Sequence, residues 1–159
     1  MSVPTIKETN WLLVIPQLLF MGLVIGIYYL AGIHDFFVLG MLTYGVISFG
    51  VRGYLTREHR QGINRVNQSA FHEAIPYFQN SYDFFNKHPW IDKHRYITML
   101  TPSKMCYREM ALNNLAFCYV KTGNADKAIE FYERCVAEYP ENAMARRGLN
   151  LLKAHSNKE

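Results

Sequence analysis

The sequence predicts an all-α protein in which a two-helix transmembrane hairpin precedes a small domain of helical hairpins with a C-terminal capping helix. Two observations support this prediction. Asp35 is the only formally charged residue between Trp11 and Val51, whereas the chain from Arg52 onward carries 16 lysines and arginines against 11 acidic residues. In that later part, apolar residues recur at three- and four-residue intervals, which is the spacing of one face of an α-helix.

Residues 1–10 form a short polar tail, and residues 11–31 form the first transmembrane helix that we expect. Its apolar run of about 20 residues, at roughly 1.5 Å rise each, matches a hydrocarbon core of about 30 Å. A cleaved signal peptide is the alternative. The run is longer than the core of a usual signal peptide, however, and no clear A-x-A cleavage site follows it.

The second transmembrane helix is expected at residues 34–55, after a short polar break that makes the two helices antiparallel neighbours. The break carries no basic residue, whereas four arginines follow the second run. The positive-inside rule therefore places both termini and the later domain in the cytoplasm, and we expect a bacterial inner membrane. Three of these arginines are expected at the lipid headgroups, namely Arg52, Arg57 and Arg60.

Glycines occur along both expected spans. Small residues let helices approach closely in lipid, where packing rather than hydrophobicity drives association. They can pack the hairpin against itself, form a homodimer or receive a partner's helix, and the spacing does not choose among these. The expected helix-packing positions are Gly22, Gly26, Gly40, Gly45 and Gly50.

Residues 109–142 contain two helical stripes separated by a break. Gly123 can adopt the left-handed conformation that ends a helix, and Asn124 or Asp126 can cap the next one. The first stripe consists of Leu112, Leu115, Ala116 and Tyr119. The second stripe, which Tyr139-Pro140 ends, consists of Ala128, Ile129, Tyr132, Cys135 and Val136.

These residue types within a 34-residue segment resemble a tetratricopeptide repeat. In this arrangement the small Ala116 and Ala128 let two helices approach closely. An ordinary helical hairpin is the alternative, but it needs only the apolar periodicity and not this set of residues. The resemblance implies a helix-turn-helix unit that binds an extended peptide or a helix of a protein partner.

Residues 56–88 resemble a degenerate first repeat, in which Gly62, Ala74 and Phe78 stand at matching positions. We expect the second transmembrane helix to run without a break into residues 57–67, since no strong helix breaker precedes Ser69.

Residues 89–108 are then an insertion, partly a lengthened first helix that starts after Ser103. The insertion either covers a hydrophobic edge or the membrane surface, or it binds a partner. Residues 143–154 form the capping helix, which covers the last hydrophobic edge, and residues 155–159 form a frayed tail.

The resemblance also implies which residues line the concave groove formed by the first helices. Asn114 matches one member of the carboxylate clamp of some family members, but His59 and Ile63 replace its partners, so an apolar or helical ligand is expected. Alternatively, the insertion or the membrane-proximal helix fills the groove. The expected groove residues are His59, Ile63, Met110, Asn113, Asn114, Phe117, Val120, Lys121 and Arg147.

No motif points to catalysis, a cofactor or a metal ion. The sequence has no phosphate-binding loop, dinucleotide fingerprint or nucleophile elbow. His88 and His94 lack a matching acidic or thiolate set. Three cysteines without CxxC spacing predict free thiols in a reducing compartment. Because the basic cluster follows an apolar span, it favours lipid headgroups over nucleic acid as its partner.

We therefore expect a non-enzymatic, membrane-anchored scaffold or adaptor that binds a protein partner and recruits or assembles it at the membrane. One alternative is an accessory subunit of a larger membrane complex, held through the glycine-bearing helices. Another is a self-associating membrane scaffold, which would be a homo-oligomer. No cofactor is expected.

Overall fold

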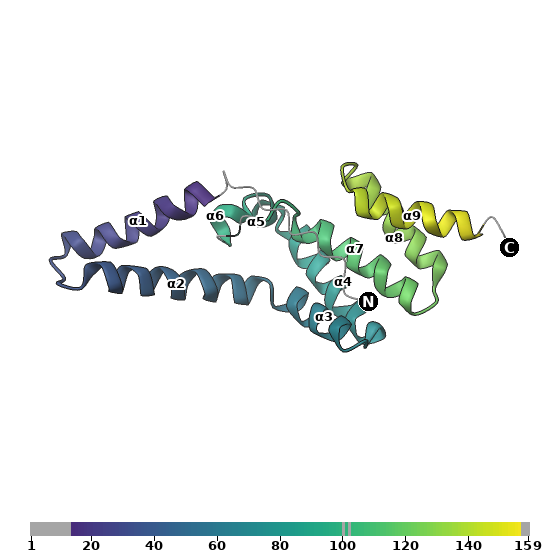
Figure 1. The fold of residues 1–159 in the computed structure, drawn as a ribbon, viewed down its shortest axis with the longest axis horizontal. Helices are drawn as coiled ribbons and strands as arrows, with labels where there is room; N and C mark the ends of the chain where they lie inside the picture. Colours follow the sequence, from purple (N-terminus) through teal and green to yellow (C-terminus); the bar gives the residue numbers. More distant parts are fainter. Residues whose placement is uncertain (1–13, 100, 102, 157–159) are drawn as a thin grey trace. The chain divides into compact units, whose positions relative to one another are not determined.

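The computed structural model describes residues 14–99, 101 and 103–156, and the regular elements within them are helices (Figure 1). These residues divide into two compact units, which are described separately. The hairpin unit comprises residues 14–57 and 90–104, and the repeat unit comprises residues 58–89 and 105–156. The expected start of the first span at Trp11, the tail at 1–10 and residues 157–159 of the expected C-terminal tail lie outside the described residues. The first two residues of that expected tail, 155 and 156, belong to the last helix, which ends at Ser156.

Helices α1 (Ile15–Leu30) and α2 (Phe36–Leu55) of the hairpin unit lie antiparallel and in contact (Figure 1). Aromatic contacts run along their shared face, from Tyr29 and Phe36 beside the connecting loop to Phe20 and Tyr44 further along. Between these contacts, a hydrogen bond of 2.9 Å joins the hydroxyls of Tyr28 and Thr43.

The close approach of these two helices depends on Gly40. A Cβ atom at this position would lie 2.7 Å from Cγ1 of Ile25, so no larger residue fits without a shift of the backbone. At the other expected packing positions a Cβ atom would meet nothing within 4 Å. These positions are Gly22, Gly26, Gly45 and Gly50. Packing within the hairpin therefore uses Gly40, while the other four positions stay predictions for contacts with another chain.

Helix α2 has 20 residues and is apolar and long enough to cross a membrane. Helix α1 is also apolar but has 16 residues within the described part of the chain, which is shorter than a full span. Large apolar residues are exposed on both helices, for example Leu30, which is 85% exposed, and Phe49, which is 75% exposed. The described residues thus contain one candidate span, α2, and a shorter apolar helix packed against it.

The expected continuous helix from the second span into residues 57–67 is wrong, because the helix is interrupted at Thr56. Helix α2 ends at Leu55, and α3 (Arg57–Asn67) begins after Thr56. The Thr56 hydroxyl donates a 2.8 Å hydrogen bond to the carbonyl oxygen of Arg52, four residues earlier. A threonine that bonds in this way competes with the helical backbone and favours a bend or an end.

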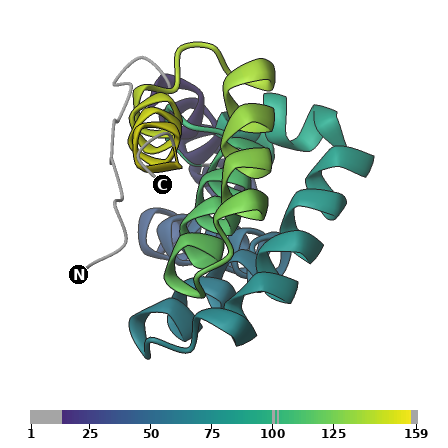
Figure 2. The same cartoon turned by 90° about the vertical axis from the view of Figure 1, so that its right-hand side faces the viewer.

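The repeat unit contains two helical hairpins and a last helix. Its helices are α3, α4 (Phe71–Lys87), α7 (Tyr107–Lys121), α8 (Ala125–Glu138) and α9 (Ala143–Ser156). Helix α7 packs against both α4 and α8, and α8 packs in turn against α9 (Figure 2). The last helix thus covers the second hairpin, as the sequence predicts for a cap.

Two hydrophobic clusters hold the repeat unit together, and α7 contributes to both. One cluster joins α4, α7, α8 and α9 and contains Tyr82, Ala111, Leu112, Ala116, Tyr132, Cys135 and Ala145. The other joins α3, α4 and α7 and contains Val66, Ala74, Phe78, Leu115 and Cys118. The predicted small contact residues Ala116 and Ala128 are both fully buried.

The turn between α7 and α8 follows the sequence prediction. Gly123 has a φ of 76°, and the side chain of Asn124 accepts a 3.1 Å hydrogen bond from the backbone N–H of Lys127. Asn124 rather than Asp126 is therefore the cap. At the other end, α7 begins at Tyr107 after an extended Cys106 and not directly after Ser103, so the expected lengthening of this helix is smaller than predicted.

The insertion forms two short helices, α5 (Pro89–Lys93) and α6 (Arg95–Thr98). The Arg52 side chain of α2 donates a 3.4 Å hydrogen bond to the carbonyl oxygen of Met99, and α6 contacts α1. The Arg95 guanidinium holds the segment in a closed loop because it donates to the backbone carbonyl oxygens of Asp92, Ser103 and Lys104. Residues 90–104 therefore pack as part of the hairpin unit.

We predict that Gly62→Ala destabilises the repeat unit. A Cβ atom at Gly62 would lie 2.8 Å from the ring of Phe78, which is fully buried in the cluster that joins α3, α4 and α7. Overpacking of this kind costs about 1–3 kcal/mol, more than the helix propensity gained by replacing glycine. Thermal unfolding of the full chain in mild detergent, followed by circular dichroism, measures the loss.

Asn64→Ala on the exposed side of the same helix is the control and should leave the unfolding temperature within a degree or two. Equal unfolding temperatures for Gly62→Ala and the wild type would show that Phe78 moves aside at no cost.

Candidate protein-binding face

The nine expected groove residues all lie in the repeat unit, but they differ in exposure. Val120, Lys121 and Arg147 are exposed, whereas Met110, Asn114, Phe117 and Ile63 are half-buried. His59 and Asn113 are buried. The exposed and half-buried members on α7 form a face opposite the stripe that carries Leu112, Leu115 and Ala116 into the core. This α7 face consists of Met110, Asn114, Phe117, Val120 and Lys121.

His59 lies inside the unit, where 7% of the residue is exposed. Its ring packs edge-on against Phe78 and Tyr107, and Nδ1 lies 3.4 Å from the Ser81 hydroxyl oxygen. Burial disfavours the charged imidazolium and lowers the pKa of His59 to about 4. The ring is therefore neutral near pH 7 and acts as an interior packing group between α3, α4 and α7.

Asn113 is buried where α7 meets the segment leading to α9. Its side-chain amide donates a 3.2 Å hydrogen bond to the carbonyl oxygen of Glu109. The Glu109 carboxylate in turn accepts a 2.9 Å bond from the side chain of Asn142, just before α9. Within the described residues, the Asn113 Oδ1 atom has no hydrogen-bond partner. A buried acceptor without a hydrogen-bond donor costs folding free energy, because it has lost its bonds to water and gained none in the protein.

Phe117 is half-buried because Phe71 of α4 covers one side of it. The two rings pack edge-on with centroids 6.0 Å apart, and the Lys121 ammonium lies 5.6 Å from the Phe117 ring centroid. Sequence reasoning missed Phe71 as a neighbour of the α7 face. The signal was present, because Phe71, Ala74 and Phe78 follow the spacing of one helical face.

An open cavity of about 280 Å³ adjoins this end of the α7 face. It lies between the end of α7 and the start of α4, where Ser69 has a φ of 60°. Both polar and apolar atoms line it, so it suits a peptide segment of mixed character. The lining residues are Ser69, Ala70, Phe71, His72, Glu73, Lys121 and Thr122.

The arginines expected at lipid headgroups occupy different settings. Arg57 and Arg60 are exposed, while Arg52 is half-buried and bonds to the carbonyl oxygen of Met99 in the insertion. Sequence reasoning missed this contact of Arg52 with the insertion, because nothing in the spacing links two segments 47 residues apart.

Two of the three cysteines are interior groups. Cys118 and Cys135 are fully buried, and desolvation raises the pKa of each thiol to about 12. Both thiols are therefore protonated near neutral pH, and neither is a nucleophile. Their role is packing, in the two clusters that α7 shares.

Comparison with known families agrees with this geometry. A family model described as tetratricopeptide repeat matches residues 110–142, which cover α7, the Gly123 turn and α8. No curated protein and no solved structure matches the chain. The match confirms the predicted repeat in this segment. Repeats of this kind are typically non-catalytic modules that bind other proteins.

We predict that His59 makes the repeat unit less stable in mild acid. Because the folded pKa of about 4 lies below the unfolded value of 6.5, the unfolded chain binds the extra proton first. Stability is therefore lost as the pH falls from about 6.5 toward 4, by about 2 kcal/mol between pH 7 and pH 5. Urea unfolding of the full chain in mild detergent at both pH values gives the difference.

His59→Gln removes the titrating group and should remove most of this difference, whatever its effect on stability at pH 7. Asn64→Ala, at an exposed position of the same helix, removes no titratable group and is the control, which should leave the pH dependence unchanged. Identical pH dependence in the wild type and His59→Gln would contradict a buried, neutral His59.

Proposed function

We propose that the protein is a membrane-anchored, non-enzymatic scaffold or adaptor that binds a protein partner and recruits or assembles it at the membrane. The observation that carries this proposal is the tetratricopeptide-repeat match over α7 and α8. Stacked repeats of this family use the surface formed by their helices to bind other proteins.

The α7 face suits an apolar or helical segment of the partner. Val120 is 38% exposed, and the half-buried Phe117 and Met110 extend the apolar surface along the helix. Lys121 adds a positive charge beside the Phe117 ring. A partner helix with an apolar stripe and an acidic residue near one end complements these groups.

The hairpin unit supplies the anchor in this proposal. Helix α2 is long and apolar enough to span a membrane, and the apolar run of α1 begins in the sequence at Trp11. We place both helices across a bacterial inner membrane, with the repeat unit and both termini in the cytoplasm, because basic residues follow α2 and none lies in the connecting loop. Confinement to the membrane raises the effective concentration of the α7 face for a membrane partner.

We predict that Val120→Asp releases the partner. A buried aspartate in an apolar contact is costly, so association should weaken by about tenfold or more. The measurement is purification through a C-terminal tag from native membranes in mild detergent, with the mass of the intact complex and the amount of the co-purifying chain determined together.

Ala137→Asp introduces the same charge at an exposed site on α8 and is the matched control, which should keep the partner. Equal amounts of the co-purifying chain in both variants would rule out the α7 face as its binding site.

A second candidate function is an accessory subunit held in a larger membrane complex by α1. The observation that favours it is the open space around Gly22 and Gly26, where a neighbouring helix could pack closely. In this case Gly26→Leu should lose the co-purifying chain while Val120→Asp keeps it. A homo-oligomer held by the same helices would appear in the same experiment as a mass that is a multiple of one chain.

We predict that the repeat unit is protected from protease added outside intact spheroplasts and digested in inverted membrane vesicles. The charge distribution around α2 is the physical reason. The full chain should also resist extraction by alkaline carbonate. Digestion of the C-terminal tag in intact spheroplasts would reverse the proposed orientation, and extraction by carbonate would contradict a membrane-spanning anchor.

A further inference from the structure

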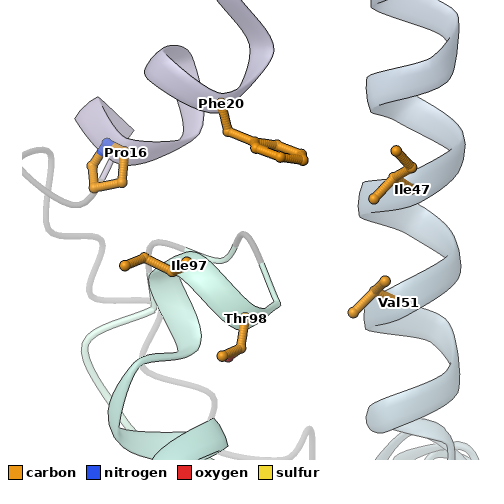
Figure 3. Close-up of a pocket in the computed structure, with 6 residues that line it drawn as sticks. All are labelled: Pro16, Phe20, Ile47, Val51, Ile97 and Thr98. Carbon is orange, nitrogen blue, oxygen red and sulfur yellow. The ribbon is translucent and has the colours of Figure 1, made fainter. Parts of the chain in front are cut away.

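The hairpin unit contains an apolar cavity that the proposed function does not use. The cavity has a volume of about 140 Å³ and is partly open. It lies where the start of α1 and the end of α2 meet α6 of the insertion (Figure 3). Its lining residues are Pro16, Phe20, Ile47, Val51, Ile97 and Thr98.

The cavity offers almost nothing polar to an occupant. Figure 3 shows the side chains of Phe20, Ile47 and Val51 directed into the space between the helices. The Thr98 hydroxyl is already used, since its single proton is shared between the carbonyl oxygens of Ile91 and His94, which lie 2.8 Å and 3.1 Å from the hydroxyl oxygen. An apolar cavity of about 150 Å³ stays dry and accepts a hydrocarbon the size of benzene. Hydrocarbon is therefore the expected occupant.

The position of the cavity along the hairpin indicates where this hydrocarbon comes from. Val51 lines the cavity and Arg52 directly follows it, so the cavity lies at the end of α2 where apolar sequence gives way to basic sequence. In the proposed topology this is the cytoplasmic edge of the hydrocarbon core. A phospholipid there has its acyl chains at the depth of Val51 and its phosphate at the depth of the basic residues.

The insertion beside the cavity has the composition of a segment that lies at a membrane surface. Trp90 is 60% exposed and Ile97 is 58% exposed. Residues 90–104 carry three basic residues, Lys93, Arg95 and Lys104, against the single buried carboxylate of Asp92. Exposed tryptophan and isoleucine beside lysine are typical of interfacial segments that meet anionic lipids.

We propose that this cavity binds one anionic phospholipid, with part of an acyl chain between α1, α2 and α6 and the phosphate group near Lys93 and the basic end of α2. This inference rests on the proposed membrane hairpin. Charge complementarity selects the lipid, because any acyl chain can fill an apolar cavity but only an anionic headgroup gains from the basic residues of the insertion and of the sequence that follows Val51. The insertion is thus a lipid-binding element and not a contact site for the protein partner.

The test is native mass spectrometry of the full chain in mild detergent, with phosphatidylglycerol or phosphatidylcholine added in turn. The wild type should retain one phosphatidylglycerol in preference to phosphatidylcholine. Val51→Phe fills the cavity and should reduce retention by about tenfold, because the larger side chain excludes the acyl chain. Val46→Phe is the matched control on the same helix, since Val46 is 74% exposed and outside the cavity, and it should retain the lipid.

Lys93→Gln tests the headgroup contact separately. It should lower retention of phosphatidylglycerol by about fivefold, the effect of one basic residue near an anionic surface, and leave phosphatidylcholine unchanged. Circular dichroism of each variant verifies that the helical content is kept. Equal effects of Lys93→Gln on both lipids would overturn the proposed selectivity for anionic headgroups.

Other occupants give different results. If residues 1–13 of the same chain fill the cavity, Val51→Phe and Val46→Phe retain equal amounts of lipid, and the proposal is wrong. If a second copy fills the cavity, Val51→Phe converts a dimer into a monomer without a change in bound lipid, which also overturns the proposed lipid site.

Alkaline carbonate extraction of the same membranes distinguishes failure of the lipid site from failure of the proposed membrane anchor. A chain that stays in the membrane but fails these lipid tests contradicts the lipid site alone, whereas a chain that carbonate extracts contradicts the anchor as well.

Discussion

Helix α7 is buried on two sides at once, and the repeat unit depends on this shared burial. Leu112 and Ala116 enter the cluster with α8 and α9, while Leu115 and Cys118 enter the cluster with α3 and α4. A helix held on both sides has a fixed rotation about its axis. The remaining face, with Phe117, Val120 and Lys121, is therefore positioned by the core and not by its own contacts. A partner would meet a surface whose geometry exists before binding, which lowers the entropy lost on association.

A different set of contacts organises the hairpin unit. Arg52 bonds the end of α2 to the insertion, and Arg95 closes the insertion on itself through three backbone carbonyl groups. Charged side chains thus fold a segment that is too short and too polar to form a core of its own. In the proposed function, this places a cationic, tryptophan-bearing segment at the end of the anchor, while the repeat unit remains available for a protein partner.

The sequence predicted which helix carries the candidate binding face, but not which of the expected groove residues are exposed. Helical phase placed Met110, Asn114, Phe117, Val120 and Lys121 on one side of α7, because the 3.6-residue period is a local property, and the resemblance to a tetratricopeptide repeat made this side the groove. The resemblance also assigned His59 and Asn113 to the same groove, although both are buried. Burial depends on which neighbours arrive from elsewhere in the chain. Tyr107 and Phe78 surround His59, and sequence spacing does not encode that meeting.

By itself, the sequence determined the local events of this fold, such as the turn at Gly123, a cap at Asn124 or Asp126 and the stripe that α7 buries. Each of these follows from steric limits and hydrogen bonds within a few residues. The break at Thr56 belongs with the local events, because its hydroxyl bonds to a carbonyl oxygen four residues earlier, but a threonine also fits a continuous helix and its spacing gave no warning. The attachment of the insertion through Arg52 and the cavity beside Val51 were decided only by the tertiary structure. Both features join segments distant in the chain, and their energy exists only once those segments meet.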